Sequence, residues 1–274
     1  MPKLKTISPL IKLFSLKNKN IIIIGGTGKM GISFSKILSE AGARVFLLDI
    51  NLNKKLIKNP KIIFIKCDVT NESQTKIIIN KIIKKYKKIN VMIYNVYSKP
   101  KNYYKKFENY DFSTWKKVLD TNLSGAFTVS QIMIKHFKKK KIPGNLIFVL
   151  STYGIVGPDL GIYKGLNAKK NIYGGNFSLT TPAAYTSSKS ALLGLMKYIA
   201  STNGKDNIRA NSLTPGGVFD GQEKRFVKNY NKKVPLKRMA NFDDYDGAIL
   251  FLSSDASSYM TGSNLIVDGG WTAW

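Results

Sequence analysis

Short apolar runs rich in Ile, Val and Leu alternate along the chain with longer stretches in which apolar residues recur every three or four positions. Continuous β-branched runs predict strands that are buried on both faces, and these runs cover residues 20–24, 44–48, 62–65, 91–94, 145–150, 207–213 and 264–267. The helical spacing predicts helices over about residues 32–41, 72–87, 111–139, 182–203 and 242–253. The alternation predicts an α/β fold, with one doubly wound parallel sheet and helices on both of its faces.

Neither an internal repeat nor a linker divides this pattern, so we expect a single domain. Residues 1–13 are interpreted as an N-terminal extension and residues 14–274 as the domain. Two long polar segments interrupt the alternation, at about 153–181 and about 217–236. Connections of this length are usually functional or disordered. We interpret the first as a substrate lid, with an unordered insertion as the alternative, and the second as a substrate loop.

The composition narrows the class of protein. The net charge is +28, but the excess is almost entirely lysine scattered among Ile and Asn, which does not indicate dedicated nucleic-acid binding. The single cysteine, Cys67, excludes an internal disulfide framework and favours a cytoplasmic location. The single histidine, His136, is expected on the surface, and no group of residues has metal-ligand spacing. We find neither an apolar run long enough to cross a membrane nor a signal-peptide pattern.

A glycine-rich turn joins the first strand to the first helix. Gly25, Gly28 and Gly31 would permit a tight turn and a close approach of the backbone to a pyrophosphate at the positive end of the helix. Thr27 and Met30 lie in the same turn. The strand–turn–helix context predicts a Rossmann-like dinucleotide site, with an ordinary turn between strand and helix as the alternative.

An acidic residue ends the second strand, where a dinucleotide site requires one. Asp49 follows Gly31 by 18 positions and would accept hydrogen bonds from the adenosine ribose. Its charge would repel a 2′-phosphate, which predicts NAD as the preferred cofactor. The nearby cations Lys29 and Arg44 leave NADP open.

The sequence Tyr185-Thr186-Ser187-Ser188-Lys189 lies in a helix that Pro182 can open. The spacing places Tyr185 and Lys189 on one helix face. A neighbouring ammonium favours the tyrosinate, and a phenol whose pKa is brought toward neutrality can act as a general acid or base. Taken alone, the pair is better explained as an ordinary solvated helix face, so its interpretation depends on the surrounding motifs.

These motifs occur in the order found in the short-chain dehydrogenase/reductase family, which the chain resembles from about residue 14 to residue 270. The resemblance implies a Rossmann-like fold and a nicotinamide cofactor. It implies that the cofactor is bound by Gly25, Thr27, Gly28, Met30, Gly31, Asp49, Asp68, Val69, Asn95, Tyr185, Lys189, Pro215, Gly216 and Val218.

The resemblance also implies roles in catalysis for Asn122, Ser151, Tyr185 and Lys189. Tyr185 would give a proton to a carbonyl oxygen or take one from an alcohol, and Ser151 would hydrogen-bond the same oxygen. Lys189 would lower the pKa of Tyr185 and hold the nicotinamide ribose, while Asn122 would bind a water that relays protons. Ser151 as a strand-end cap and Asn122 as a helix-kink residue are the structural alternatives.

The chain departs from the family at Tyr94 and Tyr97, which stand where Asn and Gly are usual, so we expect a reshaped wall beside the cofactor ribose. The two polar segments are rich in aromatic, amide and cationic residues, which favours a polar substrate such as a sugar. The C-terminal sequence and the long lid resemble a bacterial branch that acts in surface-sugar and flagellin-glycan biosynthesis. Trp271 and Trp274 favour a subunit interface in a homodimer or homotetramer.

The sequence therefore predicts an NAD(P)-dependent oxidoreductase that acts on a secondary alcohol or ketone. A ketoreductase of the 3-oxoacyl-carrier-protein type is the alternative within the same class, although Asp49 and the long lid disfavour it. A dinucleotide-binding scaffold without catalysis is the alternative from another class, and the altered Tyr94 and Tyr97 are its motivation.

Overall fold

The computed structural model describes residues 8–51, 59–167 and 179–274. Seven parallel strands form one sheet in the order β3-β2-β1-β4-β5-β6-β7. The strands are β1 (Asn20–Ile24), β2 (Arg44–Asp49), β3 (Ile62–Lys66), β4 (Val91–Tyr94), β5 (Gly144–Val149), β6 (Ile208–Pro215) and β7 (Asn264–Val267). The predicted doubly wound sheet is confirmed, and its strand order reverses between β1 and β4, where ligands bind in folds of this kind.

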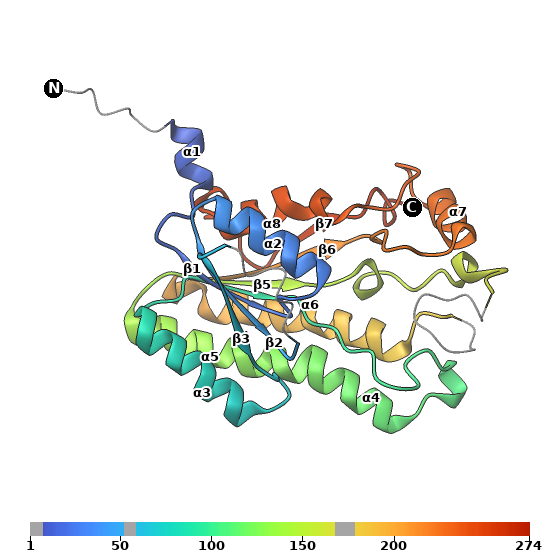
Figure 1. Ribbon diagram of the computed structural model, residues 1–274, viewed down its shortest axis with the longest axis horizontal. Coiled ribbons are helices and arrows are strands. Elements are labelled where there is room, and N and C mark those ends of the chain that lie inside the picture. Colours follow the sequence, from blue (N-terminus) through green and yellow to red (C-terminus); the bar gives the residue numbers. More distant parts are fainter. Residues whose placement is uncertain (1–7, 52–58, 168–178) are drawn as a thin grey trace.

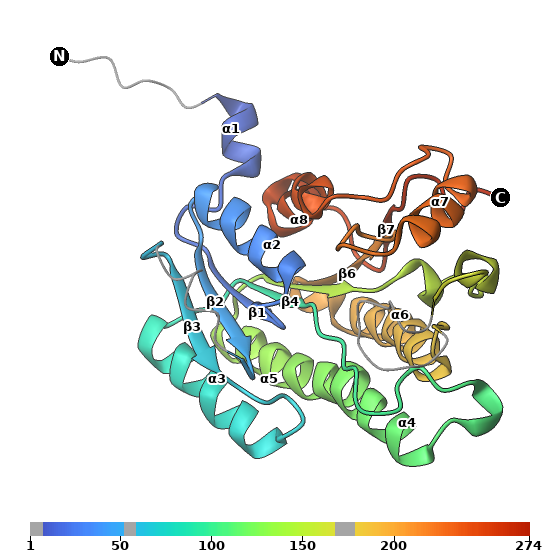
Figure 2. The ribbon, with the colours of Figure 1, turned by 45° about the vertical axis from the view of Figure 1, so that its right-hand side comes forward.

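Helices cover both faces of the sheet, as Figures 1 and 2 show. One face carries α2 (Lys29–Glu40) and α8 (Asp246–Ser253), and the other carries α3 (Glu72–Tyr86), α5 (Gly125–Lys140) and α6 (Ala183–Asn203). Each layer has its own apolar core, because alternate side chains of every central strand point to opposite faces. The helices on both faces predicted from the sequence are therefore confirmed.

The helix predicted over 111–139 is three segments in the structure. A π-helix, Asp120–Ser124, lies between α4 (Phe112–Leu119) and α5. The buried Tyr94 donates its hydroxyl proton to the carbonyl oxygen of Thr121 within this π-helix. Tyr94 therefore satisfies a carbonyl of the bulge and lies in the apolar core, so the expectation that it reshapes the cofactor wall is wrong.

Two helices are absent from the sequence prediction. The first, α1 (Pro9–Phe14), has no buried residue and projects from the body of the molecule in Figures 1 and 2. The predicted division between extension and domain falls at its end, and Leu16 just beyond it is buried in the core. The second, α7 (Lys224–Lys233), lies inside the segment 217–236 that was expected to be a loop.

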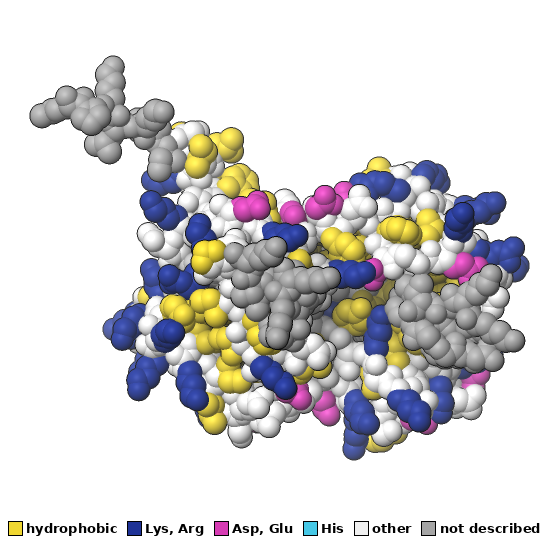
Figure 3. Space-filling model, in the orientation of Figure 1, with side chains coloured by type: hydrophobic (Ala, Val, Ile, Leu, Met, Phe, Trp, Pro, Cys, Tyr) yellow, Lys and Arg dark blue, Asp and Glu magenta, His cyan; other side chains and the backbone are white. Residues whose placement is uncertain are grey.

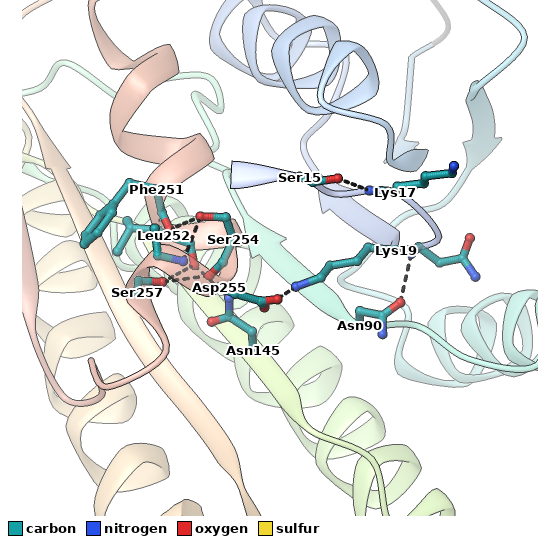
Figure 4. A network of polar contacts seen from close by, with 12 residues as sticks. Ser15, Lys17, Lys19, Asn90, Asn145, Phe251, Leu252, Ser254, Asp255 and Ser257 are labelled. Carbon is teal, nitrogen blue, oxygen red and sulfur yellow. Dashed lines mark hydrogen bonds and ion pairs between the residues drawn. The ribbon is translucent and has the colours of Figure 1, made fainter. Parts of the chain in front are cut away.

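The amino-terminal ends of the strands are closed by a polar network (Figure 4). Asn90 accepts a hydrogen bond from the backbone N–H of Asn20, and Asn145 donates one to the carbonyl of Leu252. Lys19 forms an ion pair with Asp255, beyond the end of α8. These contacts fix the strand starts to each other and to α8, and the side chains predicted to do chemistry lie at the opposite edge of the sheet.

His136 is buried on α5, where its Nε2 accepts a hydrogen bond of 3.1 Å from the N–H of Ile89. The expectation of a surface histidine is therefore wrong. Burial lowers its pKa, and the nearby Lys140 ammonium lowers it further. The neutral ring serves as a core hydrogen-bond acceptor.

Lysine and arginine side chains are spread around the face shown in Figure 3 and do not gather in one patch there. Within the described ranges, no helix is both long enough and apolar enough to cross a membrane.

Candidate active site

The predicted site residues converge at the carboxyl-terminal edge of the sheet. A cavity of about 390 Å³ opens there between the strand ends, α6 and the segments that follow β5 and β6. Its lining includes these predicted residues: Gly28, Met30, Asn95, Ser151, Tyr185, Lys189, Pro215, Gly216 and Val218. The volume is in the range of a small-molecule site.

The turn after β1 has the geometry that a pyrophosphate requires. Gly25 has φ +74° and lies close to Asn95. A Cβ on Gly25 would stand 2.8 Å from the carbonyl oxygen of Asn95. A Cβ on Gly31 would stand 2.7 Å from the carbonyl oxygens of Gly25 and Gly26, so glycine is needed for α2 to pack on the turn. At Gly28 a Cβ would meet no protein atom closer than 3.7 Å, which leaves the space in front of the helix open.

The start of α2 is free to bind an anion. Gly28 is its N-cap residue, and no side chain caps the helix there. Unsatisfied N–H groups and the positive helix end favour a negative charge at this point. The predicted pyrophosphate position thus agrees with the local structure.

Asp49 ends β2 beside the same turn. One carboxylate oxygen accepts the N–H of Thr27 at 3.0 Å, and the other accepts the N–H of Asn51 at 3.3 Å. Thr27 also donates its hydroxyl proton to the carbonyl of Asn51. Asp49 is therefore held at the strand end with carboxylate lone pairs left for a diol, as an adenosine ribose needs.

Asp68 and Val69 lie outside the lining of the cavity. Asp68 is exposed after β3 and accepts hydrogen bonds from the N–H and hydroxyl of Thr70. The Val69 side chain is buried against Gly125 in the core, which leaves only its backbone for an adenine. The turn that contains both residues follows β3, next to the end of β2.

Tyr185 and Lys189 lie on one face of α6, as the spacing predicts. The Nζ atom of Lys189 is 5.9 Å from the centroid of the Tyr185 ring. Lys189 is buried and donates to the carbonyl of Val149 at 2.7 Å and to that of Val96 at 3.3 Å. Burial lowers its pKa to about 7. The two carbonyls fix the ammonium between the ends of β4 and β5.

Asn122 joins the π-helix to α6. Its Nδ2 donates to the hydroxyl of Ser188 at 2.9 Å, and its Oδ1 accepts the N–H of Ser98 at 3.0 Å. Ser188 in turn donates to the carbonyl of Tyr185. Asn122 is thus a positioning residue for α6 and for the loop after β4. The π-helix that presents it is a feature often found at functional sites.

Ser151 lies directly after β5 and lines the cavity. Its Oγ accepts the N–H of Tyr153 at 3.2 Å, which makes it the cap of a short 3₁₀ turn. Because the oxygen accepts in that bond, its own proton is available for another acceptor. The capping role expected as the alternative is therefore present, and it is compatible with hydrogen bonding to a substrate oxygen.

Two tyrosines that the sequence analysis did not assign hold the loop after β6. Tyr230 accepts the N–H of Gly217 at 2.6 Å, and Tyr245 donates to the carbonyl of Gly216 at 3.1 Å. Trp271 stacks on Tyr230 with 4.7 Å between ring centroids and is buried within its own chain. This burial removes Trp271 from the reasons for expecting a subunit interface, whereas Trp274 remains 76% exposed.

The described part of the predicted lid, residues 153–167, packs against α7. Asn229 donates to the carbonyl oxygens of Ile162 and Lys164, and Arg225 donates to that of Gly165. Asp159 pairs with Lys233 at 2.9 Å. We call residues 153–167 together with α7 the cap. The predicted lid and the predicted substrate loop form one structure, and residues 168–178 of the lid lie outside the described part of the chain.

Tyr97 and Lys99 line the cavity in the loop after β4. The ring of Tyr97 meets that of Tyr185 edge-on, with 6.3 Å between centroids. The Nζ atom of Lys99 lies 5.1 Å from the centroid of the Tyr97 ring. The sequence analysis noted Tyr97 only as a departure from a family pattern and missed Lys99, since nothing in the local sequence distinguishes this lysine from the many others.

Lys29, at the start of α2, forms an ion pair with Asp220 of the segment after β6. This contact joins two parts of the cavity lining that are 191 positions apart in the sequence.

The residues present fit a dinucleotide. The glycine turn, the uncapped helix start and Asp49 offer the backbone approach, positive end and diol acceptor that one requires. A metal centre lacks comparable support: in residues 8–51, 59–167 and 179–274, no three His, Cys, Asp or Glu side chains gather as ligands.

Two family models match the chain. One described as short chain dehydrogenase matches residues 19–163, and one described as Enoyl-(Acyl carrier protein) reductase matches residues 169–272. A solved short chain dehydrogenase from Leptospira borgpetersenii with bound NAD+ superposes with a TM-score of 0.85 at 28% identity, over 97% of each chain.

Two curated proteins illustrate the range of relatives. The post-translational flagellin modification protein A of Campylobacter coli is 28% identical over 265 residues, which covers 93% of this chain and 99% of that protein. A sorbose reductase of Schizosaccharomyces pombe is 30% identical over 276 residues, which covers 96% of this chain and 99% of that protein.

Proposed function

Because the chain belongs to the short-chain dehydrogenase/reductase family of NAD(P)-dependent oxidoreductases, we propose that it interconverts a secondary alcohol and a ketone of a sugar or sugar-derived substrate. The observation that carries this proposal is the convergence of Ser151, Tyr185 and Lys189 on one cavity with the glycine-rich turn. A protein that only bound a dinucleotide would have no need of this convergence.

A bound nicotinamide cofactor supplies the hydride in reduction and accepts it in oxidation. Tyr185 gives its hydroxyl proton to the carbonyl oxygen in reduction and takes the proton back from the alcohol in oxidation. Ser151 donates a hydrogen bond to the same oxygen and stabilises its developing charge. Lys189, held by the carbonyls of Val149 and Val96, places its positive charge beside the Tyr185 ring and favours the tyrosinate.

The preferred cofactor in this proposal is NAD. Asp49 already accepts the N–H of Thr27, so its carboxylate stays at the ribose position and opposes a 2′-phosphate. Of the two nearby cations that left NADP open, Arg44 begins β2 at the opposite end of the strand from Asp49, and Lys29 is paired with Asp220. That pairing reduces the attraction of Lys29 for a second phosphate.

The sugar class is supported by the polar and aromatic lining of the cavity, which includes Tyr97, Tyr163, Asn167 and Gln222, and by the likeness to a sorbose reductase. The assembly of the subunits stays a prediction.

The test compares Tyr185→Phe with Tyr198→Phe, a matched change at an exposed position of the same helix. We expect Tyr185→Phe to lower turnover of ketoses with NADH by about 10²–10⁴-fold, the contribution typical of a general acid. Both variants should still bind NADH, which a fluorescence titration measures. Equal turnover in the two variants would refute the role of Tyr185, and efficient reduction of an acetoacetyl thioester with NADPH alone would favour the ketoreductase alternative.

A further inference from the structure

Lys99 occupies a distinctive place in the cavity. It lies in the loop after β4, and its ammonium stands over the ring of Tyr97, which in turn contacts the ring of Tyr185. A cation over an aromatic face is attracted electrostatically by the ring. The position of Lys99 is thus set relative to the proposed proton donor by two consecutive ring contacts.

Basic side chains outnumber acidic ones in the described lining of the cavity. The cations are Lys29, Lys99 and Lys189, and the acids are Asp220 and Glu223. Lys189 lies behind Tyr185, where it donates to two backbone carbonyls, and Glu223 accepts the N–H of Asn167.

Asp220 is the acid that faces Lys99. It forms an ion pair with Lys29. Its negative charge also acts on Lys99, where it opposes the lowering of the pKa that burial causes. One carboxylate shared by two ammonium groups leaves Lys29, Asp220 and Lys99 with an excess of positive charge. This part of the cavity therefore favours a negatively charged ligand group.

The surroundings of Lys99 strengthen this preference. Its side chain is exposed, but to the interior of the cleft, where neighbouring protein replaces part of its hydration. This desolvation lowers its pKa to about 8 despite the opposing effect of Asp220. An incompletely hydrated ammonium gains more from a ligand anion than a fully solvated one does, because less water has to be displaced.

Building on the proposed function, we propose that Lys99 recognises an anionic group of the substrate, a carboxylate or a phosphate carried by the sugar. Tyr97 holds the ammonium in place and offers a ring face along which the sugar extends to Tyr185. The substrate class is then a hydroxy or keto sugar acid, or a sugar phosphate. A neutral polyol would be a poorer ligand.

The test is calorimetric titration of the full chain, saturated with NAD, with three compounds of the same hydroxyl configuration. D-Gluconate carries a carboxylate, D-glucitol 6-phosphate carries a phosphate, and D-glucitol is neutral. We expect the protein to bind at least one anion about 10- to 100-fold more tightly than glucitol, the value of one charge-assisted hydrogen bond. The anion that binds more tightly shows whether Lys99 recognises a carboxylate or a phosphate.

Two variants complete the test. Lys99→Met should abolish the preference for the anion while leaving glucitol binding unchanged, and Lys99→Arg should retain it. Lys101→Met, an exposed position of the same loop, removes the same overall charge and should leave the preference intact. Equal binding of all three compounds by the parent chain, or a preference that survives in Lys99→Met, overturns the inference.

Failure of the inference can be told apart from failure of the proposed function. If Lys99 has no role in substrate binding, ketose reduction and its loss in Tyr185→Phe still stand. If the proposed function fails, ketose reduction is absent or insensitive to Tyr185→Phe, whatever the calorimetry shows.

Discussion

The two walls of the cleft are built in different ways. The cofactor wall consists of the turn after β1 and the end of β2, and its contacts are made mainly by glycines, by backbone groups and by the Asp49 carboxylate that accepts the N–H of Thr27. The cap consists of residues 153–167 and α7, and its contacts join side chains to backbone groups 60 or more positions away. The cofactor wall therefore demands particular residue types, whereas the cap can be built from many.

This difference separates binding of the cofactor from selection of the substrate. A wall fixed by local backbone geometry suits a ligand that all family members share. A cap assembled from distant side chains can change without disturbing the turn. Substitutions in the two walls should therefore have separable effects, and the predictions below test this separation.

The largest effect is expected at the base of the cap. Trp271→Ala removes a buried ring that stacks on Tyr230, which holds Gly217. We expect a loss of about 3–5 kcal/mol in the free energy of unfolding and a larger fall in kcat/KM for substrate than in NADH affinity. Trp274→Ala is the control, because that side chain is 76% exposed. Equal damage to NADH and substrate binding by Trp271→Ala would contradict the separation of the two walls.

A smaller effect is expected in the cofactor wall, where two glycines should behave differently. Gly31→Ala forces a Cβ against two carbonyl oxygens at 2.7 Å, so stability should fall by about 1–3 kcal/mol together with NADH affinity. Gly28→Ala has room in the protein itself and should weaken NADH binding without loss of stability. Chemical denaturation and fluorescence titration measure the two quantities. Gly194→Ala, where a Cβ meets nothing within 4 Å, is the control.

The last effect concerns Lys189 and pH. Burial lowers its pKa to about 7, whereas an unfolded chain has the ordinary lysine value of about 10.4. Between these values the unfolded chain binds more protons at this position, so the contribution of Lys189 to the free energy of unfolding rises with pH and is lost as pH falls toward 7.

The free energy of unfolding of the parent chain should therefore rise relative to that of Lys189→Met between about pH 6.5 and about pH 9. Urea denaturation at the two pH values measures it. A constant difference would mean that the pKa of Lys189 is not lowered by burial.

The fold could be predicted from the sequence because the strands are continuous β-branched runs and the intervening helices have clear apolar spacing. The boundaries of β4 and β7 agree with the prediction to the residue. The π-helix could not be foreseen, because it depends on the hydroxyl of Tyr94 reaching Thr121 across the fold. The burial of His136 was missed for the same reason, since its partner Ile89 lies 47 positions away.

The residues of the candidate site also differ in whether the local sequence is enough to identify them. Gly25, Gly31 and Asp49 could be named from sequence, because a tight turn and a diol acceptor restrict the residue types that fit. Lys99 could not, because nothing in its local sequence distinguishes it from the many other lysines. Tyr230 could not, because its hydrogen bond to Gly217, 13 positions away, follows from the way α7 packs. Helix α7 was not predicted, because its lysine-rich sequence is typical of a polar loop.

Transfer of deuterium is the most direct measurement of the proposed chemistry. The protein is incubated with NADH that carries two deuterium atoms at nicotinamide C4 and with a mixture of neutral and anionic keto sugars: sorbose, fructose, xylulose, ribulose, fructose 6-phosphate and 5-keto-D-gluconate. The reduced products are analysed by mass spectrometry. We expect an alcohol product with one deuterium on the former carbonyl carbon, formed by the parent chain and greatly reduced in Tyr185→Phe. A reduced product without deuterium, or no product from any of these compounds, would contradict the proposal.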